Sequence, residues 1–354
     1  MQNNYIYCIG LMSGTSLDGI DLAYVKMNQN NYEDFEILQA DTIPYTKEWK
    51  KKLQEAITYN KGDLIDLDVK YGKLLGDVLK EFIKSNTITK IGFIASHGHT
   101  ILHQPAKEIT LQIGNGQEIA NITNKKVVCD FRTQDVQLGG QGAPLVPIGD
   151  KLLFSNYDYC LNLGGFANIS YEENNQRIAF DICPVNIVLN HYTRKIGYEF
   201  DDSGKIASGS EVNYQLLEAL NSLGFYQEKP PKSLGLEWVQ ENIFPLIDQF
   251  ETDIPIILRT FVEHSALQIG KVIKEESKVL VTGGGMFNTF LVRRIEFYAK
   301  IAIELNDSRL VNYKEALVFA FLGLLKTQNK ANCLQSVTGA QKDHSSGEIF
   351  YPHK

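Results

Sequence analysis

The 354-residue chain has no excess of basic residues and no paired cysteine motif. Its 35 Lys and Arg residues stand against 42 Asp and Glu residues, which gives a net charge of −7. Nucleic acid is therefore not an expected partner, because contacts between basic side chains and phosphates dominate that kind of affinity. The net charge does not exclude a small anionic ligand, since backbone amides can bind an anion without net positive charge. The five cysteines are scattered without a C-x-x-C pair, which suits a reducing cytosol.

Long apolar runs are also absent. The longest one covers residues 316–325, far short of the roughly 20 residues that span a bilayer. The N-terminus has no basic segment ahead of an apolar one, so we expect no signal peptide. We therefore expect a cytoplasmic protein without a membrane partner, and we leave a homodimer open as its oligomeric state. At roughly 100–200 residues per domain, the length predicts two domains.

The chain contains a repeated strand–glycine–strand pattern. Residues 5–9 are β-branched and aromatic, residues 10–19 form a turn rich in Gly, Ser and Thr, and a second strand follows. The pattern recurs when residues 157–163 break at Gly164-Gly165 and the chain resumes as a strand. Two such openings predict a duplicated α/β unit.

Other elements follow from hydrophobic periodicity. We predict a helix-rich stretch over residues 47–85 and helices over residues 213–223, 260–275 and 314–326. We predict strands over residues 91–95, 111–113, 127–129, 177–181 and 278–282. The segment 130–147, rich in Gly, Gln and Pro, is the best hinge candidate.

Three glycine-rich breaks each follow a strand, and the first carries the strongest signal. Its residues are Gly14, Thr15, Ser16, Leu17, Asp18 and Gly19. Glycine lets backbone amides approach a ligand, and such a turn can cradle phosphate oxygens. It is not a P-loop, because the lysine is missing and a strand follows. A plain hairpin turn is the alternative. Asp18 and Asp21 add carboxylates suited to Mg²⁺.

The other two breaks are Gly164-Gly165 with nearby Asn168, and Gly283, Gly284 and Gly285. Each is explained equally by a tight turn. Taken together, the three breaks suggest convergence on one nucleotide.

Four further residues are candidates for chemistry. Asp181 ends a strand in an apolar context and could act as a general base, with a helix cap or a salt bridge as alternatives. Arg132 suits a carboxylate or phosphate, or an inter-domain salt bridge. Glu315 opens an apolar helix, where the helix dipole alone could favour it. His97 begins a cluster after a strand that suits hydrogen bonding to a polar ligand, and less readily a zinc hydrolase site.

Nine motifs in the same order resemble the anhydro-N-acetylmuramic acid kinases, a family of the actin, sugar-kinase and Hsp70 superfamily. They lie at residues 10–21, 96–98, 111–114, 130–132, 139–147, 162–168, 283–285, 315–317 and 337–340. The resemblance covers nearly the whole chain, and the first and fifth motifs are highly specific.

The resemblance implies an α/β fold with two ribonuclease-H-like, actin-like domains around a central nucleotide cleft. The expected domains are residues 1–130, with residues 335–354 packing back on them, and residues 131–334. It implies use of ATP and Mg²⁺. Residues 14–19 and Asp21, then Gly164, Gly165 and Asn168, and then Gly283–Gly285 would bind ATP, with Asp18 at the metal.

The same resemblance implies an enzyme that opens the 1,6-anhydro ring of 1,6-anhydro-N-acetylmuramic acid and phosphorylates O6. The product would be N-acetylmuramic acid 6-phosphate, in peptidoglycan recycling. Asp181 would be the catalytic base, and His97, Arg132 and Glu315 would bind the sugar. A kinase for another sugar and a non-catalytic ATP-binding protein of the same fold are the alternatives.

The chain departs from the family pattern beside the expected base. The family commonly has Thr-Gly-Pro-Gly after the aspartate, whereas Ile182, Cys183 and Val185 replace the hydroxyl and the two glycines here. His99 stands where glutamine is usual, and Leu236 replaces a common arginine. These changes bear on the choice of sugar.

Overall fold

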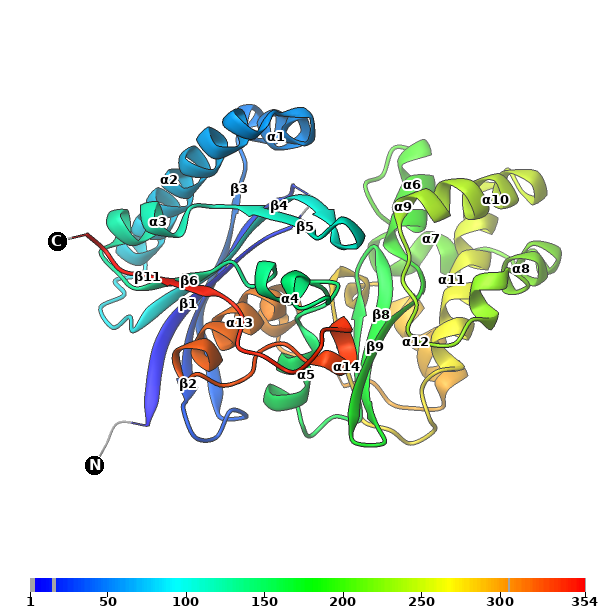
Figure 1. The fold of residues 1–354 in the computed structure, drawn as a ribbon. Helices are drawn as coiled ribbons and strands as arrows, with labels where there is room; N and C mark the ends of the chain where they lie inside the picture. The colour runs from blue at the N-terminus through cyan, green and yellow to red at the C-terminus, as the bar shows by residue number, and fades with distance from the viewer. Residues whose placement is uncertain (1–3, 15–16, 305, 354) are drawn as a thin grey trace. The chain divides into compact units, whose positions relative to one another are not determined.

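The computed structural model describes residues 4–14, 17–304 and 306–353 (Figure 1). It divides into two compact units, Met1–Leu153 with Tyr313–Lys354, and Phe154–Asn312. This division differs from the expected boundaries at residues 130 and 334, because residues 131–153 and 313–334 belong to the first unit. The hinge candidate at residues 130–147 lies within that unit.

The first unit is built on a seven-stranded sheet in the order β11-β6-β4-β1-β2-β3, with β5 paired to β4. β1, β2 and β3 are antiparallel, β4 runs parallel to β1, and β6 runs parallel to β4. β11, near the C-terminus, pairs with β6. The bounds are β1 Tyr5–Ser13, β2 Gly19–Asn28, β3 Phe35–Pro44, β4 Phe93–Gln104, β5 Ile109–Ile113, β6 Val127–Cys129 and β11 Glu348–Phe350.

Helices pack on this sheet through an apolar core that includes the fully buried Tyr71, Leu75 and Leu79 of α2. The helices of this unit are α1 Lys47–Glu55, α2 Lys61–Ser85, α3 Gly116–Thr123, α4 Thr133–Gln137, α5 Pro147–Leu153 and α14 Gln335–Thr338, with 3-10 turns η1 Ala56–Thr58 and η2 Pro105–Lys107. Helix α13, Ser308–Thr327, is broken at the non-helical Tyr313 and lies in this unit from there on.

The second unit has a four-stranded sheet in the order β10-β7-β8-β9. β7 Tyr159–Leu163, β8 Phe166–Glu173 and β9 Gln176–Pro184 are antiparallel, and β10 Val279–Thr282 runs parallel to β7. The order repeats that of β3-β2-β1-β4 in the first unit, with three antiparallel strands followed by a parallel fourth. The expected α/β fold, with a duplicated unit, is therefore confirmed.

Helix α11, Ile254–Gly270, packs against β9 and α12 in the core of this unit (Figure 1). The other helices are α6 Asn186–Lys195, α7 Lys205–Ser208, α8 Tyr214–Asn221, α9 Leu236–Trp238, α10 Phe244–Phe250 and α12 Thr289–Ala299, with η3 Asp202–Gly204, η4 Gly224–Gln227, the π-helical η5 Val239–Ile243 and η6 Gly284–Phe287. No helix in the described ranges has the length and apolar character needed to cross a membrane.

The helix-rich stretch predicted over residues 47–85 contains two helices, because the Asn60 side chain caps a new start at α2. Two strands differ from the sequence prediction. β1 continues through Gly10 to Ser13, where the sequence predicted a turn. β4 includes the histidine cluster that was expected beyond its end, and the glycine at Gly98, with φ of 75°, is accommodated inside it.

The backbone of β1 approaches α13 closely at Gly10. A Cβ atom there would lie 1.8 Å from the carbonyl oxygen of Ala316. Gly323 lies two turns after Ala316 on α13. It also leaves no room for a side chain, because a Cβ atom there would lie 2.7 Å from the ring of Phe93. The absence of side chains at these glycines lets α13 lie directly on β1 and β4.

We predict that Gly10→Ala lowers the free energy of unfolding by about 3 kcal/mol or more, at the upper end of overpacking costs, because the added methyl meets backbone. Urea denaturation, followed by circular dichroism, measures the change. Gly224→Ala is the matched control, because no atom lies within 4 Å of a Cβ there and its φ is not positive. Equal stability of the two variants would contradict the close approach.

Candidate functional site

The turn between β1 and β2 is tight. The Leu17 amide donates to the Gly14 carbonyl over 3.3 Å, and Leu17 has a φ of 60°, in the left-handed region that non-glycine residues seldom adopt. Asp18 is exposed at the end of this turn. Thr15 and Ser16, also expected to bind phosphate, lie outside the described residues. A strained turn at the end of two strands is typical of a functional loop.

Asp21, on β2, lies next to this turn. Its Oδ1 atom accepts a hydrogen bond of 2.6 Å from the Thr42 hydroxyl on β3. Burial raises the pKa of Asp21, the Thr42 hydrogen bond opposes the rise, and the charge of Asp18 adds to it. Two neighbouring carboxylates with competing charges suit a divalent cation, since oxygen atoms are the ligands Mg²⁺ prefers.

His97 and Arg132 contact each other directly. His97 is buried, its Nδ1 atom lies 2.9 Å from the Gly98 carbonyl, and its Nε2 atom accepts from Arg132 Nε at 2.9 Å. Burial lowers the pKa of His97 well below its usual value, and the Arg132 charge lowers it further. His97 is therefore neutral, with its proton on Nδ1, and it fixes the guanidinium. Arg132 Nη1 donates to the Gly142 carbonyl over 2.6 Å.

This arrangement does not support a zinc site on the first two histidines of the cluster. His97 presents its Nε2 lone pair to a cationic side chain, so the pair is a hydrogen bond rather than a metal ligand set. Within the described ranges, the group of three or more His, Cys, Asp and Glu side chains close enough to share an ion does not include His97 or His99.

A buried hydroxyl network that sequence reasoning missed holds His99. The Ser13 hydroxyl lies 2.7 Å from the Tyr71 hydroxyl and 3.3 Å from His99 Nδ1, and Tyr45 bonds to Tyr71 in turn. Ser13 and His99 are paired in register on β1 and β4. Burial lowers the pKa of His99 to about 4. Tyr45 and Tyr71 have no local motif that could have revealed this network.

Glu315 lies in the first turn of α13 after the break at Tyr313. Its side chain is accessible to solvent, yet desolvation raises the pKa of its carboxylate. The Arg132 charge opposes that rise and the Asp21 charge adds to it, so these three groups influence one another. The neighbouring Lys314 forms a buried ion pair of 2.7 Å with Asp150 on α5, which anchors this turn.

In the second unit, the two glycine turns lie together. β7 and β10 are parallel with Asn162 opposite Thr282, so the turns that follow them share one sheet edge. Gly283, with φ of 83°, fits against this edge, because a Cβ would lie 2.6 Å from Asn162 Oδ1. At Gly284 a Cβ would meet no atom within 4 Å. The structure therefore joins two of the three predicted glycine breaks, with open space beside one of them.

The Gly164-Gly165 turn supports the start of α6. The Gly165 carbonyl accepts from the Val185 amide at 2.8 Å, and the Gly164 carbonyl accepts from the Asn186 amide at 3.3 Å. The Asn186 side chain donates to the Leu163 carbonyl. The turn thus fixes the segment that directly follows β9.

Asp181 lies on β9 beside a β-bulge. Ala167 pairs with Cys183 and the exposed Asn168 pairs with Asp181, so Ile182 is the extra residue. Bulges of this kind redirect side chains and are common next to active sites.

Backbone groups of the segment 232–234 hold Asp181, a contact that sequence reasoning missed. The Leu234 amide donates to Asp181 Oδ2 over 2.9 Å, and the Asp181 amide donates to the Lys232 carbonyl over 3.1 Å. Within the described part of the chain, no donor contacts Oδ1. Burial raises the pKa of Asp181, and the Leu234 hydrogen bond opposes the rise. A half-buried carboxylate with one oxygen available can accept a proton.

Comparison with known proteins identifies the family. The model of the family described as anhydro-N-acetylmuramic acid kinase matches residues 6–352. The chain belongs to the anhydro-N-acetylmuramic acid kinase family. It is therefore a kinase, as expected from the motifs.

Similar curated proteins carry the same description. The anhydro-N-acetylmuramic acid kinase of Francisella tularensis subsp. novicida (strain U112) is 32% identical over 99% of this chain and 100% of its own length. That of Bacillus cereus (strain Q1) is 30% identical over 98% of this chain and 100% of its own.

Among solved structures, the activator of the 2-hydroxyisocaproyl-CoA dehydratase from Clostridium difficile covers 91% of this chain and 97% of its own, with 14% identity and a TM-score of 0.44. A ROK family glucokinase from Streptomyces griseus covers 89% and 98%, with 11% identity and a TM-score of 0.39. These values add nothing to the fold described above.

We predict that His99 makes the protein less stable as the pH falls. In the unfolded chain its pKa is near 6.5, and in the folded protein it is about 4. Between those values the unfolded state binds the extra proton, so the free energy of unfolding falls by up to about 3 kcal/mol as the pH drops through this window.

Urea denaturation of wild type and His99→Gln between about pH 7 and pH 4 measures this effect. The loss of stability on acidification is smaller in His99→Gln. His353→Gln, which changes an exposed histidine, is the control and keeps the wild-type pH dependence. Equal pH dependence in wild type and His99→Gln would contradict the neutral, buried state of His99.

Proposed function

We propose that this kinase opens the 1,6-anhydro ring of 1,6-anhydro-N-acetylmuramic acid and phosphorylates O6, which yields N-acetylmuramic acid 6-phosphate in peptidoglycan recycling. Membership of the family supports the substrate. The observation that supports the chemistry is Asp181, a half-buried carboxylate with a raised pKa, one anchored oxygen and one available oxygen.

The substrate explains why a base is needed. In a 1,6-anhydro sugar O6 is part of an acetal, so it carries no hydroxyl proton and cannot be phosphorylated directly. Asp181 takes a proton from water, and the water oxygen bonds to the anomeric carbon. The bond between that carbon and O6 breaks, and its electron pair stays on O6. O6 then bonds to the γ-phosphorus of ATP, and ADP leaves.

The raised pKa of Asp181 suits this role. A carboxylate of higher pKa is a better proton acceptor, and positioned general bases contribute roughly 100- to 10,000-fold in rate. The Leu234 amide fixes Oδ2, so Oδ1 would take the proton without a rotation of the side chain. Orientation of this kind lowers the entropic cost of the step.

The glycine turns fit the phosphates of ATP. Backbone amides at Gly14, in the Gly164-Gly165 turn and at Gly284 would donate to phosphate oxygens, which bind well to such turns. The carboxylates of Asp18 and Asp21 would hold Mg²⁺, which neutralises charge on the transferred phosphoryl group. The fit rests on Asp21 at the start of β2, whose pKa is raised by burial and by the charge of the nearby Asp18.

His97, Arg132 and Glu315 would bind the sugar. Arg132 has its Nε and Nη1 atoms engaged by His97 and Gly142, so its orientation is fixed before a ligand arrives. A fixed guanidinium suits the carboxylate of the muramic acid lactyl group. Glu315, with a raised pKa, suits a hydrogen bond to a sugar hydroxyl or amide.

We predict that incubation with 1,6-anhydro-N-acetylmuramic acid, ATP and Mg²⁺ in ¹⁸O-labelled water gives a sugar that gains one phosphoryl group and one labelled oxygen. Mass spectrometry of the sugar measures both additions. Asp181→Asn lowers turnover by roughly 100- to 10,000-fold, because the amide cannot accept the proton.

Asp202→Asn is the matched control, since Asp202 is an exposed aspartate of the same unit, and it keeps wild-type turnover. Near-normal turnover of folded Asp181→Asn would contradict the assignment of the base. Phosphorylation of a different sugar in a panel, with none of the anhydro sugar, would favour a related kinase. ATP binding without turnover of any sugar would favour a non-catalytic protein of the same fold.

A further inference from the structure

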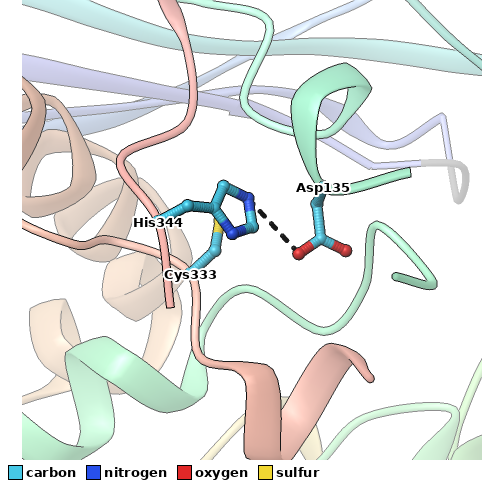
Figure 2. A group of neighbouring side chains, drawn as sticks. All are labelled: Asp135, Cys333 and His344. Atoms are coloured by element: carbon cyan, nitrogen blue, oxygen red, sulfur yellow. Dashed lines mark ion pairs between the residues drawn. The ribbon is translucent and has the colours of Figure 1, made fainter. Parts of the chain in front are cut away.

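A second group of side chains in the first unit takes no part in the proposed reaction. Figure 2 shows Asp135 from α4 facing His344, with Cys333 beside the histidine ring. All three are buried, with exposed fractions of 0%, 2% and 6% for Asp135, Cys333 and His344. Cys333 and His344 face each other across an isolated antiparallel bridge. Their backbone amides and carbonyls bond reciprocally at 3.1 and 3.2 Å, so the backbone fixes their positions.

The ring of His344 has one nitrogen engaged and one without a partner. Nδ1 lies 3.1 Å from the Lys342 carbonyl, which can only accept, so the ring proton is on Nδ1. Nε2 is buried and, within the described part of the chain, makes no hydrogen bond. It lies 3.5 Å from Asp135 Oδ1. In the neutral ring, the Nε2 lone pair would therefore face a carboxylate oxygen, which requires a cation between them or a second proton on the ring.

Asp135 is itself held by neighbours. Its Oδ1 atom accepts from the Thr338 hydroxyl at 2.8 Å, and Oδ2 accepts from the Gly142 amide at 2.7 Å. A carboxylate oxygen has two lone pairs, so Oδ1 can accept this bond and still bind a cation. Hydrogen bonds of this type orient the carboxylate ligands of metal sites.

We propose that Asp135, Cys333 and His344 form a binding site for a zinc ion. One sulfur, one nitrogen and one oxygen atom lie within 4.8 Å of one another, close enough to share one ion. Zinc binds this donor set in a tetrahedral arrangement, with a water molecule as the fourth ligand where the protein supplies three. A histidine ligand ordinarily donates its other ring proton to a backbone carbonyl or carboxylate, as His344 does to Lys342.

The charges around the proposed site determine whether the Cys333 thiol is protonated before zinc binds. Burial raises the pKa of the Cys333 thiol, and the Asp135 charge raises it further, while the Arg132 charge lowers it. The thiol is therefore protonated without an ion, and zinc binding displaces that proton to solvent. Two anionic ligands then balance the ion, which offsets the unfavourable charge of the nearby Arg132.

The ion would connect parts of the chain that are distant in sequence. Asp135 binds the Gly142 amide, and the Gly142 carbonyl binds Arg132. Cys333 and His344 belong to the C-terminal segment that returns to this unit as β11. A bound zinc ion would therefore stabilise the first unit and the loop that holds Arg132. This role is independent of the proposed reaction.

We predict that chelator-treated protein binds one zinc ion per chain when titrated against a chromophoric chelator. Cys333→Ser and His344→Gln each weaken binding by at least about tenfold, the lower range for loss of a supporting group at a metal site. Co²⁺ in place of zinc gives a thiolate-to-cobalt charge-transfer band in wild type and none in Cys333→Ser. Added zinc raises the melting temperature of wild type and leaves that of Cys333→Ser unchanged.

Cys8→Ala is the matched control, because Cys8 is a buried cysteine of the same unit on β1, and it keeps both the zinc affinity and the cobalt band. Absence of stoichiometric zinc and of the cobalt band in wild type would overturn the proposal, even if the variants fail to fold. Loss of zinc binding in His99→Gln would also overturn it, since the ion would then lie at β4. Wild-type affinity for zinc in folded Cys333→Ser would also overturn the proposal.

Discussion

The close approach of α13 to β1 is the constraint on which the proposed ligand-binding edge of the first unit depends. Gly10 presents no side chain, so the helix backbone lies against the strand backbone at Ala316. This contact brings Glu315, one residue earlier, near enough to Asp21 and Arg132 for their charges to influence its pKa. The buried ion pair of Lys314 fixes the same turn. The missing side chain at Gly10 therefore lets Glu315 lie near Asp21 and Arg132.

Burial then sets the protonation states that the chemistry needs. Desolvation disfavours the charged form of any group, so it lowers the pKa of His97 and His99 and raises that of Asp181. Neutral His97 can accept a hydrogen bond from Arg132 without charge repulsion. A carboxylate of raised pKa accepts a proton more readily. The same physical effect thus prepares a fixed cation in one unit and the proposed general base in the other.

Features that are formed by one short segment of the chain could be predicted from the sequence. The glycine turns and the strand that carries Asp181 are short segments, and both were predicted from their residues. The sequence was not sufficient where distant segments meet. Leu234 holds Asp181 through a backbone amide, which no side-chain pattern encodes. Asp135 meets Cys333 and His344 only after the C-terminal segment folds back. The histidine cluster, predicted beyond the strand, lies within β4, where His99 pairs with Ile113 of β5.

The departures beside the base leave the supports of Asp181 intact. Both contacts that hold Asp181 use backbone groups of the segment 232–234, and the start of α6 is bonded to the carbonyls of Gly164 and Gly165. Val185, which stands where the family commonly has glycine, has a φ of −135° and a ψ of −96°, outside the main β and right-handed α regions. Ile182 and Cys183 are buried in the apolar core. Because these side chains replace none of the hydrogen bonds on Asp181, the proposed base keeps both contacts that orient it.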